Sequence, residues 1–220
     1  MRTPRLRRLA FVVVATALLT EPAAAQFRGG GAAFQVRRRL AYQGSTQTQS
    51  GMWVGGEGSF RFGPLVVAGG GLMGKLTPDS AGVGSEADVQ SSWARVGLRA
   101  GAWVTVAVQV EARRLKLAAG EQLRRSIGGA VIVTPPLGIP GLSALADVGF
   151  FPSAQVTNGP KIGVALQTTF GVVFSPPSAP VFLQLSYRFE RFDIDAPTGG
   201  EPRYEEFGGL YVTGGVRLGR

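Results

Sequence analysis

Residues 103–117 read WVTVAVQVEARRLKL, with valine at positions 104, 106, 108 and 110 and mostly polar residues between them. A period of two is the spacing of a β-strand, in which successive side chains point to opposite faces. One face of this strand is therefore aliphatic, whereas the other holds Gln109 and Glu111. Such a strand suits a soluble sheet whose aliphatic face is the core, or a membrane barrel whose aliphatic face meets lipid.

The N-terminus restricts this choice. Arg2, Arg5, Arg7 and Arg8 precede the apolar run 9–20, which is followed by EPAAAQ. This is the pattern of a secretory signal peptide, here cleaved after Ala25. A membrane-spanning helix needs about 20 residues, and this apolar run is shorter. We therefore expect residues 1–25 to be a signal peptide and the mature chain to be exported.

Ten alternating segments follow residues 26–32, a glycine-rich stretch that we expect to be a flexible lead. A tilted membrane strand needs about 9–11 residues, and most of the segments are at least that long. No apolar stretch after residue 25 reaches the length of a transmembrane helix. A membrane location therefore requires a closed barrel, in which every backbone group is paired. The segments are residues 33–42, 52–62, 64–73, 89–100, 103–114, 122–134, 142–151, 161–174, 180–193 and 205–218.

The sequence thus predicts an all-β fold, an antiparallel up-and-down transmembrane β-barrel over residues 33–220, with about ten strands. An even number of strands puts both chain ends on the same side, and eight strands would satisfy this too. Connection lengths alternate, as they do in barrels with short periplasmic turns and longer outer loops. The short connections are 63, 101–102, 135–141 and 175–180; the longer ones are 43–51, 74–89, 151–160 and 195–204, with 117–121 as a short exception.

Aromatic residues lie toward the ends of several segments, with aliphatic residues between them. This distribution is typical of the aromatic belts at membrane interfaces, although the rings would also suit the core of a soluble sandwich. We predict interface aromatics at Phe60, Phe62, Phe170, Phe174, Tyr187 and Phe189.

Taken with the signal peptide and the alternating strands, these features resemble the small outer-membrane β-barrel proteins of Gram-negative-type bacteria, over residues 33–220. The resemblance is one of pattern and implies a location in the cell outer membrane. Proteins of this kind usually end on an aromatic residue that assists assembly, whereas this chain ends LYVTGGVRLGR, on Arg220.

The two faces of the predicted strands differ in charge. Charged side chains in a dry core are costly unless they are paired, but a lumen with water or ion pairs accommodates them. After Ala112 the alternation is expected to slip, because Arg113 and Arg114 are adjacent. We predict lipid-facing residues Val104, Val106, Val108, Val110, Leu183 and Leu185. We predict lumen-facing charges at Arg37, Arg39, Glu57, Arg61, Arg95, Arg99, Glu111, Asp147, Arg188 and Glu190.

Two stretches imitate binding motifs. LVVAGGGLMGKLT matches the dinucleotide-binding pattern G-x-G-x-x-G at Gly69, Gly71 and Gly74. It also nearly matches a phosphate-binding loop at Gly69, Gly74 and Lys75, but that loop needs Ser or Thr at position 76, which is leucine, and no helix is expected to follow. A Ca²⁺ site needs about six oxygens, and we interpret the acidic residues of the last outer loop as solvated instead. These acidic residues are Asp193, Asp195, Glu201, Glu205 and Glu206. We expect no metal, nucleotide or other cofactor.

The chain contains no histidine and no cysteine, and its formal net charge is +9. The enzymes known among outer-membrane barrels use a catalytic histidine, and no carboxylate or lysine is nominated as a base by its spacing. We therefore expect no enzymatic activity. An exported chain seldom meets nucleic acid, so we expect the positive net charge to suit anionic lipid or an anion-lined passage.

The leading hypothesis is a barrel with a largely side-chain-filled lumen and a structural or surface-interaction role. Its expected partners are outer-membrane lipid and lipopolysaccharide, and a surface partner at the outer loops. A narrow passive pore that prefers anions is the alternative. A secreted soluble β-barrel or sandwich that binds a ligand is the third hypothesis.

Overall fold

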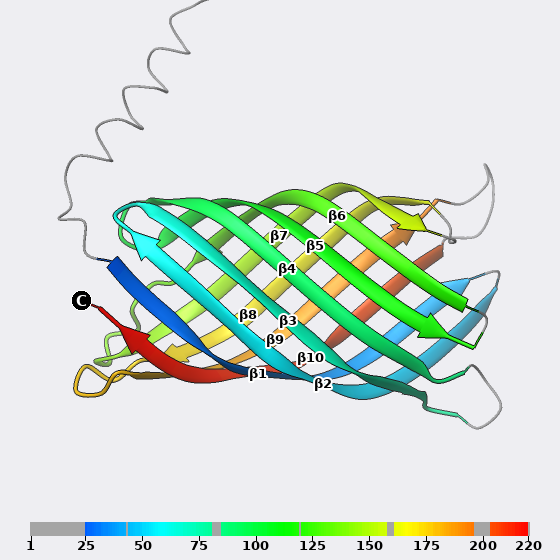
Figure 1. The fold of residues 1–220 in the computed structure, drawn as a ribbon, viewed down its shortest axis with the longest axis horizontal. Helices are drawn as coiled ribbons and strands as arrows, with labels where there is room; N and C mark the ends of the chain where they lie inside the picture. Colours follow the sequence, from blue (N-terminus) through cyan, green and yellow to red (C-terminus); the bar gives the residue numbers. More distant parts are fainter. Residues whose placement is uncertain are drawn as a thin grey trace, which may run out of the picture.

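A computed structural model describes residues 25–42, 44–80, 85–118, 120–157, 161–195 and 203–219. These residues form ten antiparallel strands that close into one barrel, in which each strand pairs with its sequence neighbours and the last with the first (Figure 1). The predicted ten-strand antiparallel barrel is confirmed. The strands are β1 (Ala25–Tyr42), β2 (Ser45–Phe62), β3 (Leu65–Pro78), β4 (Ala87–Ala100), β5 (Val104–Leu117), β6 (Gly120–Val133), β7 (Leu142–Thr157), β8 (Ile162–Phe174), β9 (Val181–Ile194) and β10 (Arg203–Leu218).

The start of β1 and the end of β10 lie at the same end of the barrel (Figure 1). We call this end, with connections 63–64, 101–103, 134–141 and 175–180, the terminal end. The opposite end, with connections 43–44, 79–86, 118–119, 158–161 and 195–202, is the loop end. Connection lengths do not separate the two ends, because 134–141 is as long as 79–86. The predicted alternation of short and long connections is therefore wrong.

Two strands extend into stretches that the sequence predicts to be irregular. Residues 26–32 belong to β1 rather than to a flexible lead, since Gly29 pairs with Val216 on one side and Gly58 on the other. The predicted loop 43–51 shrinks to the connection 43–44, because β2 begins at Ser45. Both stretches are polar or rich in glycine, yet neighbouring strands hydrogen-bond them on both sides. The predicted signal peptide lies outside the described residues, apart from Ala25.

The strand β7 continues past the point where the sequence predicts a loop. Its register against β6 shifts between Ile127 and Gly129, opposite a stretch that contains Pro152. Proline lacks the N–H that a strand ladder needs and is accommodated at such bulges. Phe151 and Ala154 are consequently both buried, although three positions separate them.

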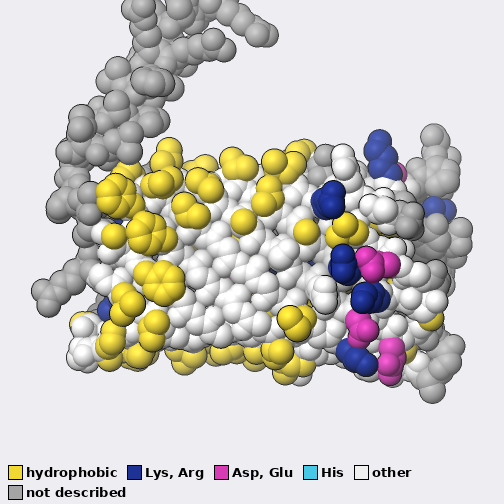
Figure 2. Space-filling view, viewed as in Figure 1, with side chains coloured by type: hydrophobic (Ala, Val, Ile, Leu, Met, Phe, Trp, Pro, Cys, Tyr) yellow, Lys and Arg dark blue, Asp and Glu magenta, His cyan; other side chains and the backbone are white. Residues whose placement is uncertain are grey.

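The outer surface carries an uncharged, largely apolar belt. The outward row of β5 runs from Val104 to Ala112 before it reaches Arg114, and the row of β9 runs from Val181 to Phe189 before Arg191. Each uncharged row spans nine residues, about the length of a tilted membrane strand. Figure 2 shows apolar side chains crowded toward the terminal end and charges gathered near the loop end.

These charges form what we call the charged girdle. Among the described residues, no outward-facing side chain between the girdle and the terminal end carries a charge. The girdle consists of Arg37, Arg39, Lys75, Asp88, Arg114, Lys116, Glu121, Arg125, Arg191, Asp193 and Glu206. The described residues contain no helix that is both long and apolar enough to cross a bilayer.

The stretch that imitates a nucleotide-binding motif is part of β3. Its glycines allow close contact between strands: a Cβ added at Gly70 would lie 2.8 Å from the carbonyl oxygen of Gly56. Glycine in a strand interior often marks such a close approach of backbones.

Candidate functional site: a lumen divided into a plug and a cup

The lumen differs between its two ends. Toward the loop end it is filled by fully buried aromatic, aliphatic and charged side chains, which we call the plug. Toward the terminal end it holds a cavity of about 200 Å³, which we call the cup. The plug comprises Phe34, Trp53, Phe192 and Phe207 with Arg38, Arg113, Arg124, Arg188, Glu111, Glu190 and Glu205.

Aromatic rings from four strands meet in the plug. Trp53 of β2 lies 5.5 Å from Phe34 of β1 and 5.6 Å from Phe207 of β10, measured between ring centroids. Phe192 of β9 contacts Phe207 edge-on at 6.2 Å. Phe34 and Phe207 are 0% exposed and Trp53 is 1% exposed. Edge-on packing at these separations is the favoured geometry of aromatic pairs.

Glu205 connects two arginines at the loop end of the plug. Its Oε1 accepts a hydrogen bond from Arg38 Nε at 2.6 Å, and its Oε2 accepts one from Arg124 Nη2. Arg38 Nη1 also donates to Gln49 Oε1 at 2.5 Å, and Gln49 Nε2 donates to the carbonyl oxygen of Ser85 at 2.6 Å. One carboxylate therefore joins β1, β6 and β10 across the lumen.

Glu190 connects a second pair of arginines, one layer deeper in the plug. It pairs with Arg113 at 2.5 Å and with Arg188 at 2.6 Å, and Arg113 also pairs with Glu111 at 2.6 Å. All four side chains are at most 7% exposed. Charges this deeply buried are tolerated only when they are paired, and every one of these four has a partner.

The plug arginines also stack on the rings. The Arg113 guanidinium carbon lies 4.5 Å from the Phe207 centroid and 5.2 Å from that of Trp53. Arg124 lies 3.9 Å from the Phe192 centroid. Cations at these distances are attracted by the ring faces. Rings and ion pairs of the described residues thus pack together across the lumen.

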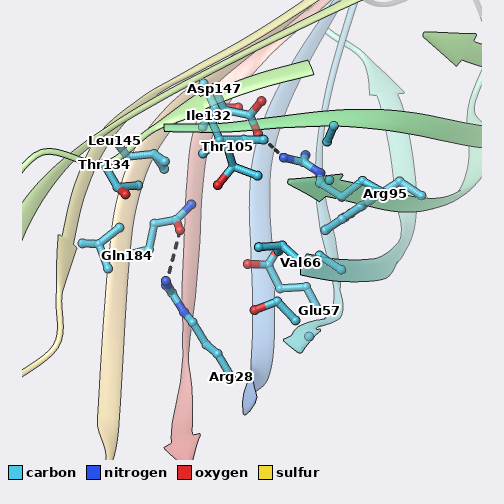
Figure 3. Close-up of a pocket in the computed structure, with 18 of the residues that line it drawn as sticks. Arg28, Glu57, Val66, Arg95, Thr105, Ile132, Thr134, Leu145, Asp147 and Gln184 are labelled. Atoms are coloured by element: carbon cyan, nitrogen blue, oxygen red, sulfur yellow. Dashed lines mark hydrogen bonds and ion pairs between the residues drawn. The ribbon is translucent and has the colours of Figure 1, made fainter. Parts of the chain in front are cut away.

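The cup begins where the plug ends. Its floor includes Tyr211, whose hydroxyl donates to Glu57 Oε2 at 2.5 Å, and Arg188. Figure 3 shows Arg28 of β1 and Arg95 of β4 reaching into the cavity from different strands. Arg95 Nη1 donates to Asp147 Oδ2 at 2.8 Å, whereas Arg28 Nη2 reaches Gln184 Oε1 at 3.5 Å.

Most predicted lumen-facing charges lie inside the barrel, in one of its two halves. Glu111, Arg188 and Glu190 belong to the plug, whereas Glu57, Arg95 and Asp147 line the cup. Arg61 and Arg99 lie on the inward rows of β2 and β4 near the terminal end.

The prediction is wrong for Arg37 and Arg39, which are exposed on the outer surface. Arg38 between them points inward instead. The prediction failed here because it assumed that the more apolar face of each strand meets lipid. In β1 the apolar row with Phe34 and Val36 faces inward and is buried in the lumen.

Two further expectations are corrected. The alternation of β5 does not slip after Ala112: Arg113 is buried in the plug and Arg114 lies in the girdle. Glu205, predicted to be a solvated loop residue, is 2% exposed in the plug. The predicted positions Asp193 and Glu206 are in the girdle, Asp195 follows β9, and Glu201 lies outside the described residues.

The lipid-facing and aromatic positions lie on the outside. Val106, Val108, Val110, Leu183 and Leu185 are exposed, and Val104 is half-buried. Phe60 and Phe62 precede the 63–64 turn and Phe174 ends β8, so these three lie at the terminal end. Phe189 lies beside the girdle, whereas Phe170 and Tyr187 pair with each other inside the belt.

Sequence reasoning missed most of the plug and, among the charged residues that line the cup, Arg28. Period-two alternation separates the two rows of a strand but does not say which row meets lipid and which faces the lumen. Because this lumen is partly apolar, hydrophobicity alone does not distinguish the two rows. In β10 the buried row contains Glu205, Phe207 and Tyr211, a mixture of charge and aromatic rings that suits neither lipid nor water. Within the described residues, no cluster of His, Cys, Asp and Glu is placed to hold a metal ion.

No protein-family model matches the sequence, and a search of curated proteins gives no match. Solved structures that resemble it include the translocator domain of the autotransporter NalP from Neisseria meningitidis, with a TM-score of 0.42 at 12% identity over 96% of this chain and 94% of that one. The beta domain of the Bordetella autotransporter BrkA has a TM-score of 0.41 at 13% identity, over 84% and 98% of the two chains. An anion-selective porin from Comamonas acidovorans has a TM-score of 0.34 at 13% identity, over 84% and 59%.

Proposed function

We propose that this protein is a non-conducting, non-enzymatic barrel of the bacterial outer membrane, with a structural or surface-interaction role. The observation that carries the proposal is the plug, where Phe34, Trp53, Phe207 and Arg113 are each at most 1% exposed. A small barrel is just wide enough for its side chains to fill. We infer that a lumen filled in this way leaves no continuous aqueous path.

The outer surface supports the proposed membrane location. A soluble barrel would expose polar side chains, whereas this one exposes Val106, Val108 and Val110 at 46–58% and holds its buried charges inside. An uncharged belt of nine residues on β5 and β9 matches the hydrocarbon crossing of a tilted strand. An exported chain inserts from the periplasm, so we infer that the terminal end faces the periplasm.

The charged girdle supports the proposed lipid partner. Lys75, Arg114 and Lys116 lie together on β3 and β5 at the loop end of the outer surface. We infer that they contact the phosphate groups of lipopolysaccharide. A protein partner would meet the loop end, but most residues of connections 158–161 and 195–202 lie outside the described residues.

Planar-bilayer recording tests the proposal. The purified mature protein should insert without steady conductance, and a steady large conductance would contradict a plugged lumen. Removing two plug rings together, Trp53→Ala with Phe207→Ala, should open a passage and produce conductance. Phe60→Ala with Phe62→Ala removes similar rings from the outer surface and serves as the matched control, which should stay silent.

A narrow anion-preferring pore is the second candidate. The observation in its favour is the excess of inward-facing arginines over acids in the terminal half of the lumen, for example Arg28, Arg95 and Arg217 against Glu57 and Asp147. Positive side chains that line a pore favour anions. Reversal potentials under a salt gradient test this candidate, and cation selectivity of any conductance would exclude it.

A further inference from the structure

We propose that the cup is a binding site for a small organic monoanion, a carboxylate attached to an apolar group, with Arg28 as the residue that meets the carboxylate. The cup lies in the terminal half of the lumen, so we infer that its ligand enters from the terminal end. This inference goes beyond the proposed function, because the site lies outside the plug.

The environment of Arg28 is unlike that of the plug arginines. Its guanidinium carbon lies 3.7 Å from the Phe182 ring centroid. The amide oxygen of Gln184 is 3.5 Å from Nη2, at the limit of a hydrogen bond. No carboxylate among the described residues lies within ion-pair distance of Arg28, and Glu57 on the neighbouring strand interacts with it electrostatically from farther away. An arginine packed on a ring with free donor groups facing a cavity is suited to a planar carboxylate, which it can bind with two hydrogen bonds.

Of the two acids of the cup, Asp147 is paired with an arginine, whereas Glu57 accepts a hydrogen bond from a neutral hydroxyl and keeps its negative charge. Asp147 accepts from Arg95 at 2.8 Å, and Glu57 accepts from the Tyr211 hydroxyl at 2.5 Å. Five arginines face inward in the terminal half of the described barrel, against these two acids, so the cup attracts anions. The five are Arg28, Arg61, Arg95, Arg99 and Arg217.

The size and walls of the cup restrict the ligand. A volume of about 200 Å³ exceeds the about 150 Å³ of a cavity that binds benzene, so a single benzene ring with a carboxylate fits. Glu57 on the cavity wall disfavours a second negative charge on the ligand. Apolar side chains supply the remaining surface, and they are Val66, Ala68, Ile132, Leu145, Val173 and Phe182.

Three probes of nearly equal shape separate charge from size: benzoate, benzamide and benzamidine. Isothermal titration of the mature barrel in detergent, with detergent-only blanks, should show benzoate binding at least tenfold more tightly than benzamide. Benzamidine, which is positively charged, should show no binding. Equal affinities for the three probes, or no binding of benzoate, would overturn the proposal.

Variants then locate the site. Arg28→Gln should weaken benzoate binding at least tenfold, and Arg37→Gln, on the outer surface of the same strand, should leave it unchanged. Glu57→Gln removes a negative charge from the cavity wall and should strengthen benzoate binding severalfold. This gain keeps the test decisive if Arg28→Gln does not fold, as judged by heat-modifiable migration. Unchanged affinity in Glu57→Gln and in folded Arg28→Gln would place binding elsewhere and overturn the proposal.

Failure of this inference is distinguishable from failure of the proposed function. Ligand binding is measured in detergent and depends on the cup alone. Conductance is measured in a bilayer and depends on the plug. A silent barrel that binds no benzoate would leave the plug standing and remove only the ligand site.

Discussion

In the loop-end half of the lumen, arginines lie between aromatic rings and buried glutamates, whereas in the terminal half they border an open cavity. Arg113 is 1% exposed, with two carboxylates and three rings around it. Arg28 has one ring and a distant amide. The same side chain thus serves as a packing element where its charge is matched, and as a candidate binding group where it is not.

The comparison shows how the side chains of the strands can themselves fill the lumen of a narrow barrel. A purely apolar lumen would resemble the outer surface and weaken the distinction between the two faces of each strand. Buried ion pairs are a poor source of stability by themselves, but an unpaired member is strongly destabilising. We infer that the paired charges of the plug fix which face of each strand points inward.

The strongest test of the difference between plug and cup removes one plug carboxylate. Glu205→Gln leaves Arg38 and Arg124 buried without a counter-charge and should lower the free energy of unfolding by about 3–5 kcal/mol. Asp147→Asn in the cup should cost about 1 kcal/mol, because water in the cavity can solvate Arg95. Guanidinium unfolding in lipid vesicles, followed by tryptophan fluorescence, measures both. Equal losses in the free energy of unfolding would show that the plug and the cup exclude water equally.

The second prediction tests whether the outer surface of the barrel contacts lipid. Val108→Arg places a charge in the middle of the uncharged belt and should cost about 2–4 kcal/mol in vesicles. Leu123→Arg, at the level of the girdle beside Arg125, should cost about 0–1 kcal/mol. The same unfolding experiment applies. Similar tolerance of both substitutions in vesicles would argue against a membrane belt.

A smaller effect on stability is expected from adding a methyl group to a glycine, and it should be larger at an inward-facing glycine than at an outward-facing one. A methyl group at Gly209, which faces inward, would collide with the carbonyl oxygen of Gln35. Gly209→Ala should therefore cost about 1–3 kcal/mol through overpacking. Gly31→Ala faces outward, where the nearest atom to an added Cβ is 3.9 Å away, and should change stability by less than about 0.5 kcal/mol. A large loss at Gly31 would contradict this assignment of faces.

The smallest expected effect is spectroscopic. Trp53 lies in the plug at 1% exposure, whereas Trp93 lines the cup and lies 4.8 Å from the Arg95 guanidinium. In single-tryptophan variants, iodide should quench Trp93 more than Trp53, because the cup admits anions. Trp103, 52% exposed at the terminal end, supplies the upper reference. Stronger quenching of Trp53 than of Trp93 would reverse the assignment of plug and cup.

Much of the barrel follows from local patterns. Alternation in β5 and β9 is fixed by the geometry of an extended chain, so the outward positions of Val106, Val108, Leu183 and Leu185 can be read directly from the sequence. In β1 the same alternation misassigned Arg37 and Arg39, because the apolar row with Phe34 faces other strands across the lumen. Polar content also misplaced strand ends: residues 45–51 are polar yet pair with β1.

The sequence by itself determined the all-β class and the faces of the most regular strands, because each depends on neighbours along the chain, and it limited the strand number to ten or eight. Only the tertiary structure decided which charges meet. Arg38, Arg124 and Glu205 are brought together from three strands by closure of the barrel. Closure likewise places Arg28 beside a cavity, with no carboxylate of the described residues within ion-pair distance. Contacts across a lumen join positions far apart in the chain, and no local spacing encodes them.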